Sequence, residues 1–219
     1  MKKQFHFLAI ICIALLVLTA CNTAKEQNST APSTTEGTNA GNDNVEIEEQ
    51  PTNASDETNS DSKNITYTSN NEQKTEETIT VNSEEQHYSM KVLPSFSLIA
   101  EEPGKDMLYL TNNDSISMRI ETISVNDTTF QELLKNTQEM MNAVDENVKY
   151  TDFDIQSYVT NNANIVNAAA YKVDLVDQAV ISVIYEKEGQ FIRLTIFDNP
   201  TADLTDAMIQ MGLTITKTN

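Results

Sequence analysis

The spacing of apolar residues changes twice along this chain. An apolar run from Phe7 to Leu18 stands near the start, a long polar stretch follows, and from about Thr78 apolar residues recur at strand and helix intervals to the end. These changes divide the sequence into residues 1–20, 21–76 and 77–219. The third part has about 140 residues, which is the size of one ordinary domain.

Alternation of apolar and polar residues predicts that most of the third part is β-structure. The later strands are joined by connections so short that they must be antiparallel neighbours. We expect strands or extended segments at residues 78–81, 87–92, 107–110, 116–125, 150–159, 165–176, 179–186, 191–197 and 213–216. The pattern does not determine their order in a sheet.

Two helices are expected between these strands. Thr129 and Glu132 have the spacing of a capping box, and apolar residues then recur at helical intervals to about Val144. Pro200 is suited to the first turn of a final helix, and Gly212 is suited to its end. The sequence therefore predicts an α+β domain, with a twisted antiparallel β-sheet and two helices packed on it.

The first 21 residues have the parts of a bacterial export signal. Lys2 and Lys3 precede the apolar run, which is too short to span a membrane comfortably. The run closes on Leu18-Thr19-Ala20-Cys21, which resembles the lipobox of bacterial lipoproteins. This resemblance implies removal of residues 1–20 and lipidation of Cys21 by diacylglycerol, whereas plain secretion is the alternative. Two or more acyl chains would hold the protein stably on the extracytoplasmic face of the cell membrane.

Residues 21–76 are rich in Ser, Thr, Asn, Gln and Glu, and Tyr67 is their only aromatic residue. A segment with so few large apolar side chains cannot bury enough surface to offset the entropy lost on ordering. We expect a disordered linker that separates the domain from the lipid anchor.

Composition argues against several functional classes. The formal net charge is −19, which does not suit nucleic-acid binding, since that depends on Lys and Arg contacting phosphates. Cys12 lies in the signal and Cys21 is the expected lipidation site, so no free thiol is expected for catalysis or zinc binding. No glycine-rich phosphate loop is present. We therefore expect no metal and no cofactor.

The remaining side chains with possible chemistry have simpler interpretations. His87 is interpreted as an ordinary strand residue rather than a general base. The pairs Asp152/Asp154 and Asp203/Asp206 could offer oxygen ligands, but they lack the ligand density of a calcium loop. Core packing is favoured over an adaptable binding surface for the methionines of the domain, which are Met90, Met107, Met118, Met140, Met141, Met208 and Met211.

The run Tyr88-Ser89-Met90-Lys91-Val92-Leu93-Pro94-Ser95-Phe96 precedes an acidic turn at residues 101–104. Together with the order of expected elements, it resembles the opening of the PsbP-like superfamily, over about residues 78–213. The resemblance implies a compact accessory or binding module without a shared set of catalytic residues. It therefore suggests a fold and no site.

These observations predict a membrane-anchored surface lipoprotein that is not an enzyme. We expect it to act as a binding or accessory module for an envelope protein or component. The alternative is a carboxylate-dependent hydrolase that acts on a cell-wall or lipid substrate.

Overall fold

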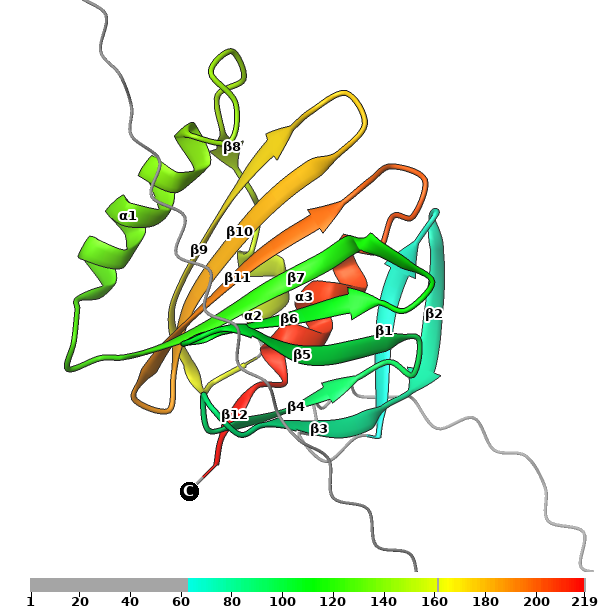
Figure 1. Ribbon diagram of the computed structural model, residues 1–219, viewed down its shortest axis with the longest axis horizontal. Coiled ribbons are helices and arrows are strands. Elements are labelled where there is room, and N and C mark those ends of the chain that lie inside the picture. The colour runs from blue at the N-terminus through cyan, green and yellow to red at the C-terminus, as the bar shows by residue number, and fades with distance from the viewer. Residues whose placement is uncertain (1–62, 161, 219) are drawn as a thin grey trace, which may run out of the picture. The chain divides into compact units, whose positions relative to one another are not determined.

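Seven antiparallel strands form the largest sheet of the computed structural model, which describes residues 63–160 and 162–218 (Figure 1). Their register places consecutive segments of the chain side by side, apart from the pairing of β7 with β11. In order across the sheet they are β5 (Phe96–Glu102), β6 (Lys105–Leu110), β7 (Asn113–Ser124), β11 (Gln190–Asp198), β10 (Ala179–Lys187), β9 (Ile165–Asp174) and β8 (Thr151–Asp152).

The remaining strands of the described residues form two smaller β-structures. A three-stranded sheet has the order β12 (Thr216–Lys217), β4 (Tyr88–Val92) and β3 (Ile79–Ser83). A separate antiparallel hairpin consists of β1 (Asn64–Ser69) and β2 (Glu72–Glu77).

Helices lie on both faces of the seven-stranded sheet. Helix α1 (Phe130–Asn142) packs on β9 and β10, whereas α3 (Thr205–Leu213) packs against β11, β4 and β1 (Figure 1). Helix α2 (Gln156–Val159) is a single turn beside β9. Successive side chains of β10 point to opposite faces of the sheet. Ile181 and Val183 therefore pack in the core around α3, whereas Ile184 packs in the core around α1. The α+β class expected from the sequence is confirmed.

The start of α1 is the capping box predicted from the sequence. The Thr129 hydroxyl accepts a hydrogen bond from the backbone N–H of Glu132, and the Glu132 carboxylate accepts one from the backbone N–H of Thr129. The hydrogen bonds that the carboxylate accepts from the Thr129 N–H and from the Thr129 and Thr128 hydroxyls lower the pKa of Glu132. The helix ends at Asn142, with Ala143 as C-cap, which is close to the expected end at Val144.

Helix α3 begins at Thr205, so the expectation that Pro200 opens it is wrong. The buried carboxylate of Asp198 explains the start. Its Oδ2 accepts hydrogen bonds from the Leu204 N–H and the Thr205 hydroxyl, both at 2.8 Å. These bonds satisfy donors that the first turn leaves free. Pro200 instead lies in a turn before the helix.

The end of α3 is held by two side chains of β10. The Tyr185 hydroxyl donates to the Gly212 carbonyl at 2.6 Å. The Lys187 ammonium donates to the carbonyls of Leu213 at 3.2 Å and Ile215 at 2.7 Å. Because Lys187 is only 6% exposed, burial lowers its pKa. A cation at this position also interacts favourably with the negative end of the helix dipole.

The hairpin of β1 and β2 spans residues 64–77 and overlaps the end of residues 21–76, so the expectation of a disordered linker reaching residue 76 is wrong. Ile65 and Tyr67 are buried in the core around α3. At the hairpin turn, Asn70 and Asn71 have positive φ values of 53° and 62°, as tight hairpin turns require. The folded domain therefore begins earlier in the chain than the polar composition of this segment indicated. The expected signal and residues 21–62 lie outside the described residues.

The structure differs from the expected elements at three further places. Strand β5 was not expected, and it pairs with β6 through a turn in which Gly104 has a φ of 78°. Within residues 150–159, expected to be extended, Gln156–Val159 is helical, and the Asp154 carboxylate accepts from the Gln156 N–H at 3.1 Å. The last expected strand is reduced to the two residues of β12. None of the described helices is long and apolar enough to cross a membrane.

Candidate interaction surface

One face of the seven-stranded sheet is covered by a helix over only part of its width. Helix α1 packs over β9 and β10, and in the described ranges no helix packs over β5, β6 and β7 on the same side (Figure 1). We call this uncovered part the open face. Its side chains are Ser97, Ile99, Glu101, Lys105, Met107, Tyr109, Ser117, Arg119, Glu121 and Arg193.

Strand register explains how the open face mixes apolar and polar groups. Ile99, Met107 and Arg119 are partners on the neighbouring strands β5, β6 and β7. Tyr109 is the partner of Ser117 one step further along the strands. Ile99 is 49% exposed. The open face therefore offers contact area as well as charge.

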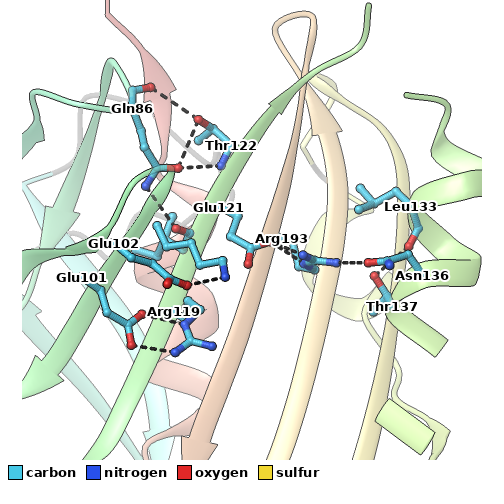
Figure 2. A network of polar contacts seen from close by, with 12 residues as sticks. Gln86, Glu101, Glu102, Arg119, Glu121, Thr122, Leu133, Asn136, Thr137 and Arg193 are labelled. Carbon is cyan, nitrogen blue, oxygen red and sulfur yellow. Dashed lines mark hydrogen bonds and ion pairs between the residues drawn. The ribbon is translucent and has the colours of Figure 1, made fainter. Parts of the chain in front are cut away.

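Arg119 forms a fork-shaped ion pair with Glu101 on this face. Its Nε and one terminal nitrogen each donate to a different carboxylate oxygen of Glu101, both at 2.6 Å (Figure 2). Hydrogen bonding to Arg119 lowers the pKa of Glu101, and the carboxylate raises the pKa of Arg119. The guanidinium is thus held rigidly while its side chain stays 33% exposed.

Arg193 joins the open face to helix α1. It is paired with Glu121 on β7, and it donates to the Asn136 amide oxygen of α1 at 2.6 Å (Figure 2). The side chains of Arg193 and Glu121 are only 13% and 11% exposed. This pair fixes the border between the covered and uncovered parts of the sheet.

The open face is balanced in charge although the chain is strongly acidic. Arg119 is paired with Glu101, Arg193 with Glu121, and Lys105 with the neighbouring Glu102. Arg119 and Arg193 are also the only two arginines of the whole sequence, against a formal net charge of −19. Arg119 therefore lies on the open face, and Arg193 lies at its border with α1.

A hollow at one end of the sheet is a weaker candidate site. It measures about 690 Å³ and opens between the turn after β6, the turn after β9 and the loop before α3. Asp177 is its only titratable side chain, and the remaining groups are amides, a hydroxyl and apolar atoms. It is lined by Leu110, Asn112, Asn113, Val176, Asp177, Asn199, Pro200, Thr201 and Ala202.

The candidate site residues named from the sequence lie at separate places in the fold. Cys21 lies outside the described residues. His87 is exposed in the turn before β4, with a φ of 52°, rather than in the strand. Asp152 and Asp154 are exposed on either side of the half-buried Phe153, as expected for solvated acids beside an extended segment.

Asp203 and Asp206 hold the first hairpin. The Asp206 carboxylate accepts from the Thr68 N–H at 2.5 Å, and the Asp203 carboxylate accepts from the Asn70 N–H at 2.6 Å. Asp203 therefore contacts the β1–β2 turn rather than only the start of a helix. In residues 63–160 and 162–218, no three His, Cys, Asp or Glu side chains are placed to hold a metal.

The methionines mostly pack in the core, as favoured from the sequence. Met90, Met118, Met141, Met208 and Met211 are almost completely buried. Met107 is the exception that matters, because it lies half-buried on the open face.

No role was expected for Arg119 or Arg193 from the sequence. Arg119 lies between Met118 and Ile120, and Arg193 lies between Ile192 and Leu194. A charged residue inside an apolar strand run points to the opposite face from the core. The sequence could therefore predict that both arginines point away from the core. Their neighbours depend on the strand order, which the sequence does not provide.

Comparison with known proteins identifies a family for this chain and solved structures with a similar fold, two of which are described here. The solution structure of PsbP from the cyanobacterium Synechocystis sp. PCC 6803 is 10% identical and has a TM-score of 0.44, covering 64% of this chain and 92% of that chain. A crystal structure of a protein from Bacteroides thetaiotaomicron VPI-5482 is 11% identical and has a TM-score of 0.40, covering 64% of this chain and 48% of that chain. Both likenesses concern fold alone.

No curated protein matches the chain. One family model does match, over residues 59–209, which is more than half of the sequence and includes the first hairpin, the sheet and most of α3. The chain therefore belongs to the family described as a domain of unknown function, DUF8580.

Proposed function

We propose that this protein is a lipid-anchored lipoprotein whose domain is a non-enzymatic binding module for another envelope protein, and that the open face is its binding surface. The observation that carries the proposal is the position of the only two arginines of an acidic chain, with Arg119 partly exposed on the open face and Arg193 at its border with α1. Arginine is prominent at the energetic centres of protein interfaces.

The other side chains of the open face suit a protein partner. Tyr109 and Met107 are of types enriched in interfaces, and Ile99 supplies exposed apolar surface beside them. Glu101 fixes the orientation of Arg119, so little rotamer entropy would be lost on binding. The balanced charge of this face also lets an acidic partner approach a domain that would repel it elsewhere.

The hydrolase alternative gains no support from the described carboxylates. A general acid needs a raised pKa, whereas the pKa of Glu101 is lowered by Arg119. Asp203 and Asp206 each accept a hydrogen bond from a backbone N–H of the first hairpin. These groups support the structure, and binding is the function that the geometry favours.

The proposed anchor is the lipid on Cys21. A Cys21→Ala variant expressed in the native host should leave the membrane fraction and should lose the mobility shift caused by acylation. Retention in the membrane with unchanged mobility would show that another element holds the protein at the membrane.

The proposed surface is tested by comparing two apolar-to-acid variants. Ile99→Glu places a charge on the open face, whereas Val176→Glu places one at a turn where the side chain is 95% exposed. After crosslinking in cells, we expect wild type and Val176→Glu to capture the same envelope protein, and Ile99→Glu to capture at least tenfold less of it. Equal capture by both variants would exclude the open face.

A further inference from the structure

The hollow of about 690 Å³ at one end of the seven-stranded sheet has the volume of a small-molecule site, which is about 300–1,000 Å³. Strand register brings its walls together, because Ala179 at the start of β10 is the partner of both Asp174 on β9 and Asp198 on β11. The turn between β6 and β7 lies at the same end of the sheet (Figure 1). Three segments that are far apart in the sequence therefore line one hollow.

Asn199 lines this hollow from the loop before α3, and its other polar groups fix its position. Its backbone N–H donates to the Asp198 carboxylate at 2.8 Å, and its carbonyl accepts from the Asp203 N–H at 3.0 Å. Its side-chain oxygen accepts from the backbone N–H groups of Thr201 at 3.0 Å and Ala202 at 2.8 Å. These two bonds identify the accepting atom as oxygen, so the remaining atom is the amide nitrogen. That nitrogen has no hydrogen-bond partner in the described part of the chain.

Asn113 lines the hollow from the start of β7 and presents a second amide in the same way. Its side-chain oxygen accepts from the Ser115 hydroxyl at 2.7 Å and from the Ser115 N–H at 3.3 Å. Its amide nitrogen has no partner among the described residues either. Each of the two amides thus offers two N–H donors whose position is set before any ligand binds. Little rotamer entropy is lost when a ligand accepts from such donors.

Asp177 supplies an acceptor to the same hollow. It is exposed in the turn between β9 and β10, and none of the ion pairs in residues 63–160 and 162–218 includes it. Leu110, Val176 and Ala202 add apolar surface to the lining. The hollow therefore combines fixed amide donors, a carboxylate acceptor and apolar atoms.

The charge of the hollow favours a neutral ligand. None of its lining residues is Lys, Arg or His, and the Asp177 carboxylate repels an anion. A cation is attracted by Asp177 but repelled by the partial positive charge of the amide N–H groups. A hydroxyl group suits both, because it accepts from an amide N–H and donates to a carboxylate. Sugars carry several hydroxyls on a ring whose C–H groups can lie on apolar side chains.

We propose that this hollow binds a neutral saccharide, whose oxygens accept from the side-chain amides of Asn113 and Asn199 while one hydroxyl donates to Asp177. The inference goes beyond the proposed function and does not rest on it, because the hollow and the open face are made of different residues.

Four sugars with the same ring test whether the ligand is neutral. Glucose and N-acetylglucosamine are neutral, glucosamine is a cation and glucuronate is an anion. In backbone amide NMR of the isotope-labelled protein, at least one neutral sugar should cause saturable shifts at residues 110–113, 176–177 and 199–202. Both charged sugars should bind at least tenfold more weakly. Absence of saturable shifts with both neutral sugars, or equal binding of a charged one, would overturn the proposal.

The tetramer of N-acetylglucosamine distinguishes a glycan strand from a free sugar. Binding at least tenfold tighter than that of the monomer would identify a glycan strand as the ligand, and equal affinity would identify a single sugar unit. The result is separate from the test of the open face, because Ile99→Glu should lose capture of the protein partner and keep its affinity for the sugar.

Aspartate variants test the two amides without removing the loop contacts. Asn113→Asp and Asn199→Asp keep the oxygen that accepts within the loop and replace the free N–H donors with an acceptor. Each should weaken sugar binding at least tenfold. Asn126→Asp, which adds the same charge at an exposed position beyond the other end of β7, should leave binding unchanged.

Asp177→Asn completes the test, because this exposed turn residue can change without disturbing the loop before α3. It should weaken sugar binding several-fold. Binding equal to wild type in Asn113→Asp, Asn199→Asp and Asp177→Asn would contradict the assignment of these side chains to a sugar.

Discussion

Buried ionisable residues connect separate elements of this domain. Asp198 extends from β11 to the first turn of α3, and Lys187 extends from β10 to the carbonyls at its other end. Both ends of one helix are thus satisfied by side chains of the sheet. The helix needs this help because its own N-cap residue, Leu204, has no side chain that can accept a hydrogen bond.

Replacement of Asp198 should destabilise the protein. In Asp198→Ala, the Leu204 N–H and the Thr205 hydroxyl lose their acceptor, and a lost cap costs about 1–2 kcal/mol. Urea unfolding followed by circular dichroism measures this change. Asp127→Ala, an exposed acid before α1, is the control and should unfold like wild type. A stability equal to the control would show that Asp198 does not hold the helix.

Lys187 should make stability depend on alkaline pH. Burial lowers its pKa below the ordinary value of 10.5. Between the lowered pKa and 10.5, the unfolded chain keeps a proton that the folded chain has released, so the free energy of unfolding rises with pH. Lys187→Met should lose this rise. Denaturant unfolding up to about pH 9.5 measures it, below the ordinary pKa of tyrosine at about 10. Equal slopes in both proteins would contradict the expectation.

At the scale of elements, the strongly periodic segments were predictable from the sequence. The capping box of α1 and the three long strands β9, β10 and β11 follow from local patterns and lie close to their expected ranges. Strand β5 was missed because its sequence, FSLIAEE, ends on exposed Ala and Glu residues with little alternation. Its strand character comes from pairing with β6.

The first hairpin was missed for a different reason. Strand β1 has only Ile65 and Tyr67 as large apolar residues, and β2 has none. Its stability depends on α3 and the loop before it, which lie more than a hundred residues later in the chain and supply Asp206 and Asp203 as acceptors. Local composition cannot show such a distant partner.

Truncation tests whether the hairpin is part of the domain. A chain that begins at residue 63 should match the full chain in stability, whereas a chain that begins at residue 78 should lose several kcal/mol. Fully burying one side chain the size of Ile65 or Tyr67 is worth about 1.5–3 kcal/mol. Chemical denaturation compares the two. Equal midpoints would mean that residues 63–77 add nothing to the core.

At the scale of the whole molecule, the two sides of the sheet differ in how they are covered. Helix α3 and the smaller β-structures cover one side, while α1 covers only part of the other and leaves the open face. The sequence predicted a binding module but not this surface, because its residues come from four strands whose order only the fold determines. The proposed function depends on this asymmetry.

Site-specific photocrosslinking at position 109 is the most direct test of the open face. A photoreactive residue in place of Tyr109 reports contacts at the open face, and one in place of Val166, a 72% exposed residue on β9, reports contacts elsewhere. In living cells, position 109 should crosslink to one envelope protein, and position 166 should not. Crosslinking of that protein at position 166 but not at position 109 would contradict the account.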